Sequence, residues 1–277
     1  MATTVALVTG ASSGIGEATA RKLRSLGYTV YGAARRFDRL ERLADDGIKP
    51  LAMDVTDDAS MKAGIEQIIA ETGRIDVLVN NAGYGSYGAL EDVDIDEGRR
   101  QFEVNVFGAM RLIQLVLPHM RAQHAGTIVN VSSMGGKIYT PLGGWYHGTK
   151  FALEALSDCL RLEVAPFGID VVVIEPGGIA TEWGGIAAQH VVETSGTGPY
   201  AGQAQAVATM LGSEANANRT SPPSVIADAI AKAVTAKRPR TRYAVGFGAK
   251  PLIAVRKVLS DRQYDALITR VGGLPRD

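Results

Sequence analysis

Five short runs of almost entirely apolar residues recur along the chain, separated by longer amphipathic segments. The runs are Val5–Val8, Tyr28–Ala33, Ile75–Val79, Thr127–Val131 and Ile169–Ile174. A strand with one face in solvent alternates apolar and polar residues, whereas a strand covered on both faces is apolar throughout. The runs therefore predict a parallel sheet with both faces covered.

The segments between the runs have the spacing of helices. We expect helices over Ile15–Ser25, Arg39–Ala44, Met61–Glu71, Glu97–Gln123 and Tyr146–Ala165. Alternating strands and helices favour parallel strands joined by right-handed crossovers. The predicted fold is α/β, a Rossmann-like doubly wound parallel sheet with helices on both faces. A chain of 277 residues suits one domain, residues 1–277.

The C-terminal third has a different composition. Gly184–Asn218 is rich in Gly, Ala, Ser, Thr and Asn, and a stretch of that length predicts a mobile substrate lid near residues 184–220. A helix is expected from Ser221 to about Ala236, because proline is tolerated in a first turn. Residues 241–277 are expected to form a C-terminal extension, with a strand over Thr241–Val245 and one or two helices within Ala249–Arg270.

Charge and cysteine content exclude several classes of protein. Lys+Arg and Asp+Glu number 29 each, so no overall field attracts nucleic acid or an anionic membrane. Cys159 is the only cysteine, which excludes an internal disulfide and fits a cytoplasmic protein; its apolar neighbours predict burial. The four histidines lack metal-ligand spacing, so no metal site is expected. No apolar run reaches the roughly 18 residues that suggest a membrane span.

A glycine-rich turn joins the first predicted strand to the first predicted helix. Its glycines have the spacing Gly-x-x-x-Gly-x-Gly, which permits a tight turn and close approach of backbone N–H groups to a pyrophosphate. A merely structural tight loop is the alternative. An NTPase phosphate loop is excluded because no Gly-Lys-Ser/Thr follows. The expected cofactor contacts are Gly10, Ser12, Ser13, Gly14, Ile15 and Gly16.

The end of the second predicted strand bears on the choice between NAD and NADP. A carboxylate there binds the ribose 2′-hydroxyl, whereas an arginine accepts a 2′-phosphate. The strand ends at Ala34 and is followed by Arg35 and Arg36, with Asp38 about a turn into the next helix. Solvated helix-start charges are the alternative interpretation of the arginines. We expect Arg35 to bind the phosphate, and NADP(H) to be preferred over NAD(H).

Ser133, Tyr146 and Lys150 form a candidate catalytic set. Tyr146 and Lys150 are four residues apart on a predicted helix and so share one face. A nearby ammonium favours the phenolate and is expected to lower the pKa of the tyrosine from about 10. Ser133 follows the Thr127–Val131 run and can present its hydroxyl to the same substrate oxygen. An exposed helical pair is the alternative for the tyrosine and lysine.

Together with the glycine turn, this set resembles the short-chain dehydrogenase/reductase family. Further matching motifs are Asn80-Asn81-Ala82-Gly83, Asn105 within Glu103–Val106, and Pro176-Gly177 with Thr181 four residues later. They occur in unbroken order from Thr9 to Thr181. The resemblance implies an enzyme that transfers a hydride between a nicotinamide and a carbonyl or secondary alcohol.

The resemblance also implies a role for each matching residue. Tyr146 is the general acid/base, Ser133 stabilises the substrate oxygen, and Lys150 holds the nicotinamide ribose. Asn105 anchors a water that relays protons to Lys150; a helix-interior Asn that bends the helix is the alternative. The implied cofactor contacts are Asp54 and Val55 at the adenine, Asn81, Ala82 and Gly83 in the cleft, Tyr146 and Lys150, and Pro176, Gly177 and Thr181 around the carboxamide. A turn cap is the alternative for Asp54.

The substrate is less well defined than the cofactor. The C-terminal part resembles the branch with 17β-hydroxysteroid and retinol dehydrogenase-like members, which implies an apolar ketone, steroid- or retinoid-like small molecule. The expected pocket wall comprises the 184–218 segment with Met134, Ile138, Tyr139, Trp145 and Trp183, each of which could instead be core or interface.

Parts of the sequence also bear on two other functions and on the assembly state. A sugar-nucleotide epimerase needs a larger C-terminal substrate domain than the chain provides. An NADP(H)-binding redox sensor or scaffold with little turnover remains the alternative function. The resemblance also implies a homodimer or homotetramer through the helices predicted over Glu97–Gln123 and Tyr146–Ala165.

Overall fold

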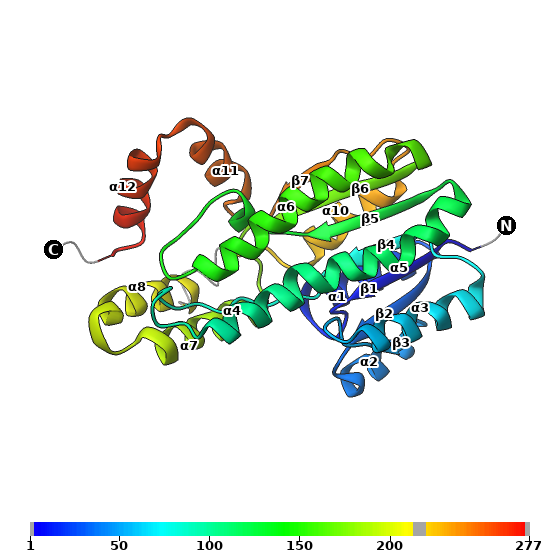
Figure 1. Cartoon of the computed structure of the whole chain (residues 1–277), viewed down its shortest axis with the longest axis horizontal. Helices are drawn as coiled ribbons and strands as arrows, with labels where there is room; N and C mark the ends of the chain where they lie inside the picture. Colours follow the sequence, from blue (N-terminus) through cyan, green and yellow to red (C-terminus); the bar gives the residue numbers. More distant parts are fainter. Residues whose placement is uncertain (1–2, 213–219, 275–277) are drawn as a thin grey trace.

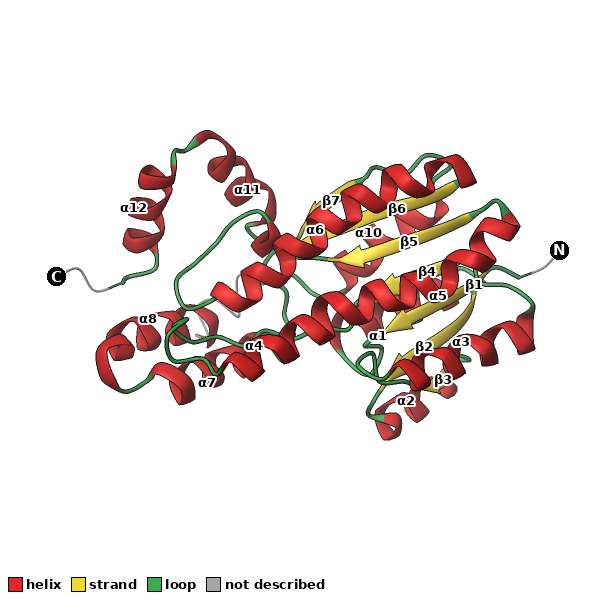
Figure 2. Cartoon of the chain, viewed as in Figure 1, coloured by secondary structure: helices red, strands yellow, loops and turns green. Residues whose placement is uncertain are grey.

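The computed structural model describes residues 3–212 and 220–274 and contains a seven-stranded parallel sheet (Figures 1 and 2). The strand order is β3-β2-β1-β4-β5-β6-β7. The strands are β1 Val5–Thr9, β2 Thr29–Ala34, β3 Lys49–Ala52, β4 Val77–Asn80, β5 Gly126–Val131, β6 Ile169–Pro176 and β7 Arg242–Val245. The order reverses between β1 and β4, which creates the crevice where such folds bind ligands. The predicted doubly wound sheet is confirmed.

Helices cover both faces of the sheet. On one face pack α3 (Asp58–Thr72), α5 (Gly108–Gln123) and α6 (Gly144–Val164), around a core that includes Leu78, Leu112 and Ile128. On the other face pack α1 (Gly14–Ser25), α2 (Phe37–Ala44) and α10 (Ser224–Thr235), around Val8 and Ile230. The central strands are buried on both sides, which is why they consist of apolar residues throughout.

Two elements in the first half of the chain differ from the sequence expectation. The strand β3 was not expected, because it lies at the edge of the sheet, contains Pro50 and leaves Lys49 exposed. The single helix expected over Glu97–Gln123 is divided into α4 (Ile95–Phe102), a π-helical turn (Glu103–Phe107) and α5. Such π turns are rare and frequently occur at functional sites.

The segment expected to be an irregular lid is largely helical. It contains α7 (Trp183–Ser195) and α8 (Ala201–Gly212), which pack against each other beyond the carboxyl ends of the strands (Figure 1). Its remaining expected residues, 213–218, lie outside the described residues. The small side chains that suggested a loop are the ones that allow α7 and α8 to approach, and Ala187 and Ala204 are both buried.

The C-terminal extension forms β7, α11 (Ala249–Val258) and α12 (Asp261–Val271). The last two helices project beyond the same edge of the sheet as α7 and α8 (Figure 1). Within residues 3–212 and 220–274, no helix is both long enough and apolar enough to cross a membrane.

Cys159 departs from its expected environment. Its side chain is exposed on α6 rather than buried. It lies thirteen residues after Tyr146 on the same helix, which at about 100° per residue places it on a different face. The apolar neighbours that suggested burial belong partly to the exposed face of α6.

Candidate active site

The glycine-rich turn has the conformation that a pyrophosphate site needs. Gly10 and Gly14 have φ values of +65° and +56°, in the left-handed region that favours glycine. A Cβ at Gly16 would lie 2.2 Å from the Gly10 carbonyl oxygen, so this position admits no side chain. Ser13 is the N-cap of α1 but makes no capping hydrogen bond with its side chain. The first-turn N–H groups of α1 are therefore suited to an anionic ligand.

Thr9 joins the glycine turn to the segment that follows β4. Its hydroxyl accepts hydrogen bonds from the backbone N–H groups of Asn81 and Ala82, both at 3.0 Å, and donates to Val79 O at 3.3 Å. The Asn81 amide in turn donates to Thr9 O at 2.9 Å. These bonds connect the two central strands across the point where the strand order reverses. They hold one wall of the cleft at a fixed distance from the other.

The adenosine end of the cleft is less completely defined. Arg35 is exposed directly after β2, and its charge acts on the Tyr84 hydroxyl across the cleft. Asp54 Oδ1 accepts hydrogen bonds from the backbone N and the hydroxyl of Thr56, at 2.9 and 2.8 Å. Asp54 therefore stabilises a turn, which was the alternative to a contact with adenine. Its neighbour Val55 packs against the core below α5.

The segment after β6 closes over the glycine turn. A Cβ at Gly177 would lie 2.1 Å from Phe247 O, and Gly177 N donates to Val245 O at 2.8 Å. Pro176 is the last residue of β6. Thr181 reaches the turn itself, because its Cγ2 lies 3.1 Å from the place where a Cβ at Gly14 would stand. Residues more than 160 positions apart in the sequence thus face each other across the cleft.

The three candidate catalytic residues meet at the end of β5. Ser133 follows that strand and caps a short turn, accepting from Gly135 N at 3.0 Å. Tyr146 and Lys150 both lie in the first half of α6 and are buried, and a hydrogen bond joins the Ser133 and Tyr146 hydroxyls. Lys150 Nζ lies 5.9 Å from the centre of the Tyr146 ring and donates to Val131 O at 2.9 Å.

The electrostatics of the tyrosine differ from the sequence expectation. Burial raises the pKa of Tyr146 to about 12, and the Ser133 hydrogen bond offsets this only in part. Burial also lowers the pKa of Lys150 to about 8, against the opposing charge of Glu154. The expected lowering of the tyrosine pKa by Lys150 is therefore not seen in the protein alone. Near neutral pH, Tyr146 keeps its proton and is a hydrogen-bond and proton donor.

Asn105 lies in the π-helical turn and is almost fully buried. Its amide donates to Tyr84 O at 2.9 Å and to the Thr149 hydroxyl at 3.1 Å, and its Oδ1 accepts from Tyr84 N at 3.0 Å. A Cβ at Gly83 would lie 3.0 Å from Asn105 Oδ1 and 3.7 Å from Lys150 Nζ. Asn105, Gly83 and Lys150 therefore converge, and the glycine leaves room for a flat ring to approach.

An aromatic cluster covers Tyr146, the candidate general acid. The Trp183 ring centre lies 5.1 Å from that of Tyr146, and Tyr87 lies 5.8 Å from each of them. Trp183, one of the expected wall residues, is the first residue of α7. Tyr87 was missed by the sequence analysis because it lies in an irregular segment without a distinctive motif. The cluster places the Tyr146 ring among other aromatic rings.

The other expected wall residues divide between the site and elsewhere. Ile138 is buried and Met134 is half-buried in the turn after Ser133. Tyr139 packs against Tyr264 of α12, with ring centres 4.9 Å apart. Trp145 faces α4, where it lies 6.3 Å from the Phe102 ring, and is not part of the catalytic cluster. Adjacent residues of a helix point about 100° apart, so Trp145 and Tyr146 cannot share one face.

His147 is a further structural residue of the site. Thr140 N donates to its Nε2 at 3.0 Å, so Nδ1 carries the proton and donates to Gly135 O at 2.8 Å. Burial lowers the pKa of His147, which keeps this neutral form near neutral pH. The imidazole thereby joins the two ends of the Gly135–Thr140 segment, which directly follows Ser133. No cluster of three His, Cys, Asp or Glu side chains in the described part of the chain is arranged to hold a metal ion.

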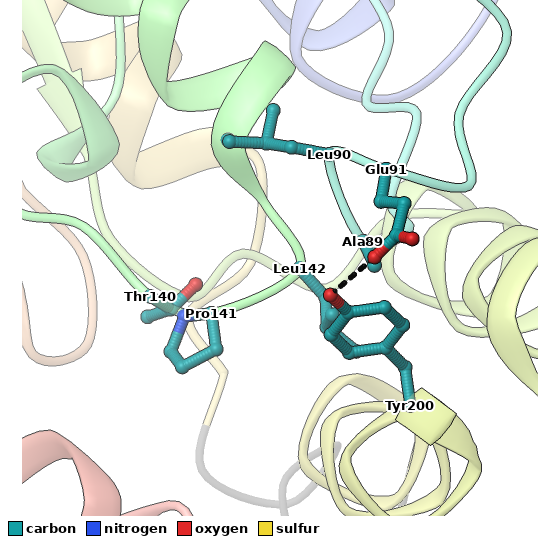
Figure 3. Close-up of a pocket in the computed structure, with 8 residues that line it drawn as sticks. Ala89, Leu90, Glu91, Thr140, Pro141, Leu142 and Tyr200 are labelled. Atoms are coloured by element: carbon teal, nitrogen blue, oxygen red, sulfur yellow. Dashed lines mark hydrogen bonds between the residues drawn. The ribbon is translucent and has the colours of Figure 1, made fainter.

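The structure also contains a groove of about 410 Å³ (Figure 3). It is lined by Ala89, Leu90, Glu91, Thr140, Pro141, Leu142, Gly144 and Tyr200. Leu142 belongs both to the groove and to the buried cluster around Tyr146, and its φ of +60° is unusual for a branched residue. The Tyr200 hydroxyl donates to Glu91 at 2.7 Å, linking the short turn that precedes α8 to the opposite rim (Figure 3).

Sequence comparison identifies the family. Residues 4–191 match the family described as short chain dehydrogenase. The chain is 44% identical over 177 residues to a 3-ketodihydrosphingosine reductase of Bacteroides thetaiotaomicron, a match that spans 64% of either chain. It is 33% identical to a probable short-chain type dehydrogenase/reductase, VdlC, of Helicobacter pylori, over 96% of this chain and 97% of that one.

Solved structures agree. A short-chain dehydrogenase from Streptomyces avermitilis is 34% identical, with a TM-score of 0.81, and the match covers 98% of this chain and 96% of that one. A metagenomic short-chain oxidoreductase in complex with NADP is 28% identical, with a TM-score of 0.69, over 87% and 96% of the two chains. A 3-ketoacyl-(acyl-carrier-protein) reductase of Brucella melitensis complexed with NADH is 27% identical, with a TM-score of 0.74, over 89% and 98%.

The chain belongs to the short-chain dehydrogenase/reductase family of oxidoreductases, whose fold it shares. The glycine cradle, the open approach at Gly83 and the contact of Thr181 with the turn fit a nicotinamide dinucleotide. The names of the relatives do not point to the expected 17β-hydroxysteroid and retinol dehydrogenase-like branch, which stays a prediction.

Proposed function

We propose that this protein is an NADP(H)-dependent carbonyl reductase or alcohol dehydrogenase. The single observation that carries the proposal is the convergence of Ser133, Tyr146 and Lys150 beside the glycine-lined cleft. The bound nicotinamide supplies or accepts the hydride. The chain supplies the position of the substrate oxygen and the proton.

The protonated state of Tyr146 is the form that carbonyl reduction requires. Because burial raises the pKa of Tyr146 to about 12, its hydroxyl holds the proton that a carbonyl oxygen must gain. Ser133 donates a hydrogen bond to that oxygen as negative charge develops on it. The Lys150 ammonium, fixed at Val131 O, stabilises the phenolate left behind. In alcohol oxidation each proton moves in the reverse direction.

NADP(H) is the proposed cofactor because no carboxylate stands at the end of β2. Ala34 ends that strand, and the exposed Arg35 follows it. Asp38 lies in the first turn of α2 and is exposed. A 2′-phosphate would meet the guanidinium of Arg35 in a partly solvated position, where a charge-assisted bond is strong and specific.

The proposed substrate has an apolar body next to its carbonyl. Tyr87, Trp183 and Leu142 pack in one cluster with Tyr146, and Leu142 also lines the groove in Figure 3. The groove carries few charges, so an alkyl or ring system of the substrate gains from burial there. Steroid-, retinoid- and long-chain ketones are therefore the first compounds to test.

The test is turnover of NADPH and NADH with aldehydes, cyclic ketones, steroid ketones, retinal and long-chain 3-keto compounds. We expect reduction with NADPH, and a loss of roughly 10²-fold or more in kcat for Ser133→Ala with NADPH affinity retained. Thr209→Ala, an exposed hydroxyl substitution on α8, is the matched control and should leave turnover unchanged. NADPH binding without any turnover would favour the sensor alternative.

A homodimer or homotetramer is the proposed assembly. Phe151 and Leu162 on α6 are 44% and 72% exposed, and Phe107 beside α5 is 54% exposed. Large apolar side chains along two adjacent helices are typical of a surface between subunits. Sedimentation should give an oligomer that Leu162→Glu dissociates. Leu26→Glu, at an exposed apolar position after α1, should leave the oligomer intact.

A further inference from the structure

A cluster of buried charges lies under α6, one helical turn beyond Lys150. Glu154 on α6 and Glu175 at the end of β6 are only 3% and 4% exposed. Glu154 Oε2 is bound by Lys137 Nζ at 2.9 Å and by Arg242 Nε at 3.0 Å. Arg242 Nε also lies 3.4 Å from Glu175 Oε1, and Arg242 Nη2 lies 2.6 Å from Asp158. Buried carboxylates need such partners, because their desolvation costs several kcal/mol.

The cluster is nevertheless incompletely satisfied. Ser132 Oγ, Glu154 Oε1 and Glu175 Oε1 are buried and have no hydrogen-bond partner within the described structure. Ser132 directly precedes the catalytic serine. A Cβ at Gly136 would lie 2.8 Å from Ser132 Oγ, 2.9 Å from Glu154 Cγ and 3.0 Å from Lys150 O. The Glu154 carboxylate, paired only through its Oε2, therefore borders the backbone of Lys150.

Glu154 and Lys150 are connected through the helix rather than by a direct bond. They are four residues apart, so their Cβ atoms lie on the same face of α6 at about 5–6 Å. Lys150 donates to Val131 O, while Glu154 is held by its two cations. Their interaction is thus one of charge across a buried, weakly screened space. It acts against burial, which favours a neutral lysine.

We propose that Glu154 is a positioning residue that keeps Lys150 in its ammonium form, and that Lys137 and Arg242 set the strength of this effect by neutralising part of the Glu154 charge. The inference rests on the proposed function, in which the Lys150 ammonium serves the nicotinamide site. It gives a reason for an incompletely paired carboxylate in the core. The cluster lies where α6 covers β5, β6 and β7 (Figure 1).

The charged groups around Glu154 come from every element packed against it. Lys150 and Asp158 belong to α6 itself, Lys137 follows the short turn after Ser133, and Arg242 comes from β7. Glu175 comes from β6 and also senses Lys257 of α11. Of these groups, Lys137 is the most suitable for substitution, because its side chain is 28% exposed and touches solvent.

Two substitutions should move the pKa of Lys150 in opposite directions. Glu154→Gln removes a negative charge near the ammonium, so the lysine should lose its proton at a lower pH. Lys137→Met removes a positive charge and leaves Glu154 less neutralised, so the lysine should keep its proton to a higher pH. Each shift is expected to be at least about half a pH unit, roughly a threefold change in proton affinity. General damage to the site would not produce opposite signs.

The direct measurement is NMR titration of isotope-labelled lysine side chains, with the Lys150 signal assigned by its loss in Lys150→Met. Glu163→Gln, an exposed carboxylate near the end of the same helix, is the matched control and should shift nothing. Shifts of the same sign, or no shift in Lys137→Met, would overturn the proposal. If Glu154→Gln does not fold, the absence of a rise in the Lys150 pKa in Lys137→Met would still overturn the proposal.

A second readout separates this inference from the proposed function. With a working substrate, the alkaline limb of the kcat/KM profile should move to lower pH in Glu154→Gln and to higher pH in Lys137→Met. The NMR titration needs neither substrate nor turnover. A protein without carbonyl reductase activity would refute the proposed function, while the pKa shifts would still support or overturn the role of Glu154.

Discussion

The Thr9 hydroxyl makes three hydrogen bonds that hold the cleft in shape. It is 1% exposed, and it accepts from the backbone N–H groups of Asn81 and Ala82 while donating to Val79 O. Thr9→Val keeps the shape of the side chain and removes every one of these bonds. The two N–H groups then lose their acceptor in a half-buried place, at about 1 to 2 kcal/mol each. The expected loss in unfolding free energy is about 2 to 4 kcal/mol.

The structure offers a matched control for this substitution. Thr19 is also fully buried, on α1, but its hydroxyl has no hydrogen-bond partner within the described structure. Thr19→Val should therefore be neutral or stabilising by up to about 1 kcal/mol, because it removes an unsatisfied polar atom. The same chemical change should thus have opposite effects at two buried positions that lie ten residues apart.

Urea unfolding monitored by circular dichroism gives the stability of both variants, and fluorescence titration gives their affinity for NADPH. Because Thr9 fixes the segment that faces the glycine turn, Thr9→Val should also weaken NADPH binding, whereas Thr19→Val should not. A Thr9→Val variant within about 0.5 kcal/mol of the parent protein would refute the reasoning. So would a Thr19→Val variant that is as unstable as Thr9→Val.

Three further predictions follow from the cleft and the catalytic residues. Gly16→Ala should lower stability by about 1 to 3 kcal/mol in urea and weaken NADPH binding, because the added Cβ would lie 2.2 Å from a backbone oxygen; unchanged binding would contradict this. Ala34→Asp with Arg35→Ala should move the ratio of kcat/KM for NADPH over NADH toward NADH, and a constant ratio would exclude Arg35 as the phosphate ligand. Lys150→Met should raise stability near neutral pH by at most about 3 kcal/mol, because burial lowers the lysine pKa from 10.5 to about 8. The unfolding free energy of the parent protein should rise between about pH 8 and 10.5, so the advantage of the variant should vanish above that range. A constant difference in unfolding free energy, measured by urea unfolding at several pH values across the range, would contradict the burial argument.

The sheet was predictable because its central strands are covered on both faces. That environment requires runs of apolar residues, and all five expected runs lie on strands. The edge strand β3 was not predicted because it is not covered in this way: Lys49 is exposed, and Pro50 interrupts the apolar pattern. The helices α7 and α8 were not predicted because the small residues that let them pack closely are also common in loops.

The candidate site was predictable where one residue type alone fits the geometry. A Cβ at Gly16 would overlap a backbone oxygen and one at Gly83 would crowd Asn105, so the glycine motifs indicate the cleft. The environment of Tyr146 was not predictable in this way. Its pKa depends on burial by Trp183 and Tyr87, which come from distant parts of the chain. The sequence suggested that the Lys150 charge would determine the pKa of Tyr146, whereas in the protein without cofactor desolvation has the larger effect.

Some errors could have been avoided by following the helical phase. Trp145 is adjacent to Tyr146, and two neighbouring residues of a helix point about 100° apart. The same phase places Cys159 on the exposed side of α6. Counting apolar neighbours in the sequence ignores this angle. Assigning each residue to a face of the predicted helix would have removed Trp145 from the pocket wall.

The most direct test of the proposed function is the rate of NADPH oxidation by Tyr146→Phe in the presence of a reducible ketone. The substitution keeps the buried ring beside Trp183 and removes only the proton donor. Tyr28→Phe, at the start of β2 and away from the cleft, is the matched control. We predict that Tyr146→Phe binds NADPH normally and loses roughly 10²- to 10⁴-fold in kcat, while Tyr28→Phe retains activity. Equal turnover by Tyr146→Phe and the parent protein would contradict the assignment of Tyr146 as the acid of the reaction.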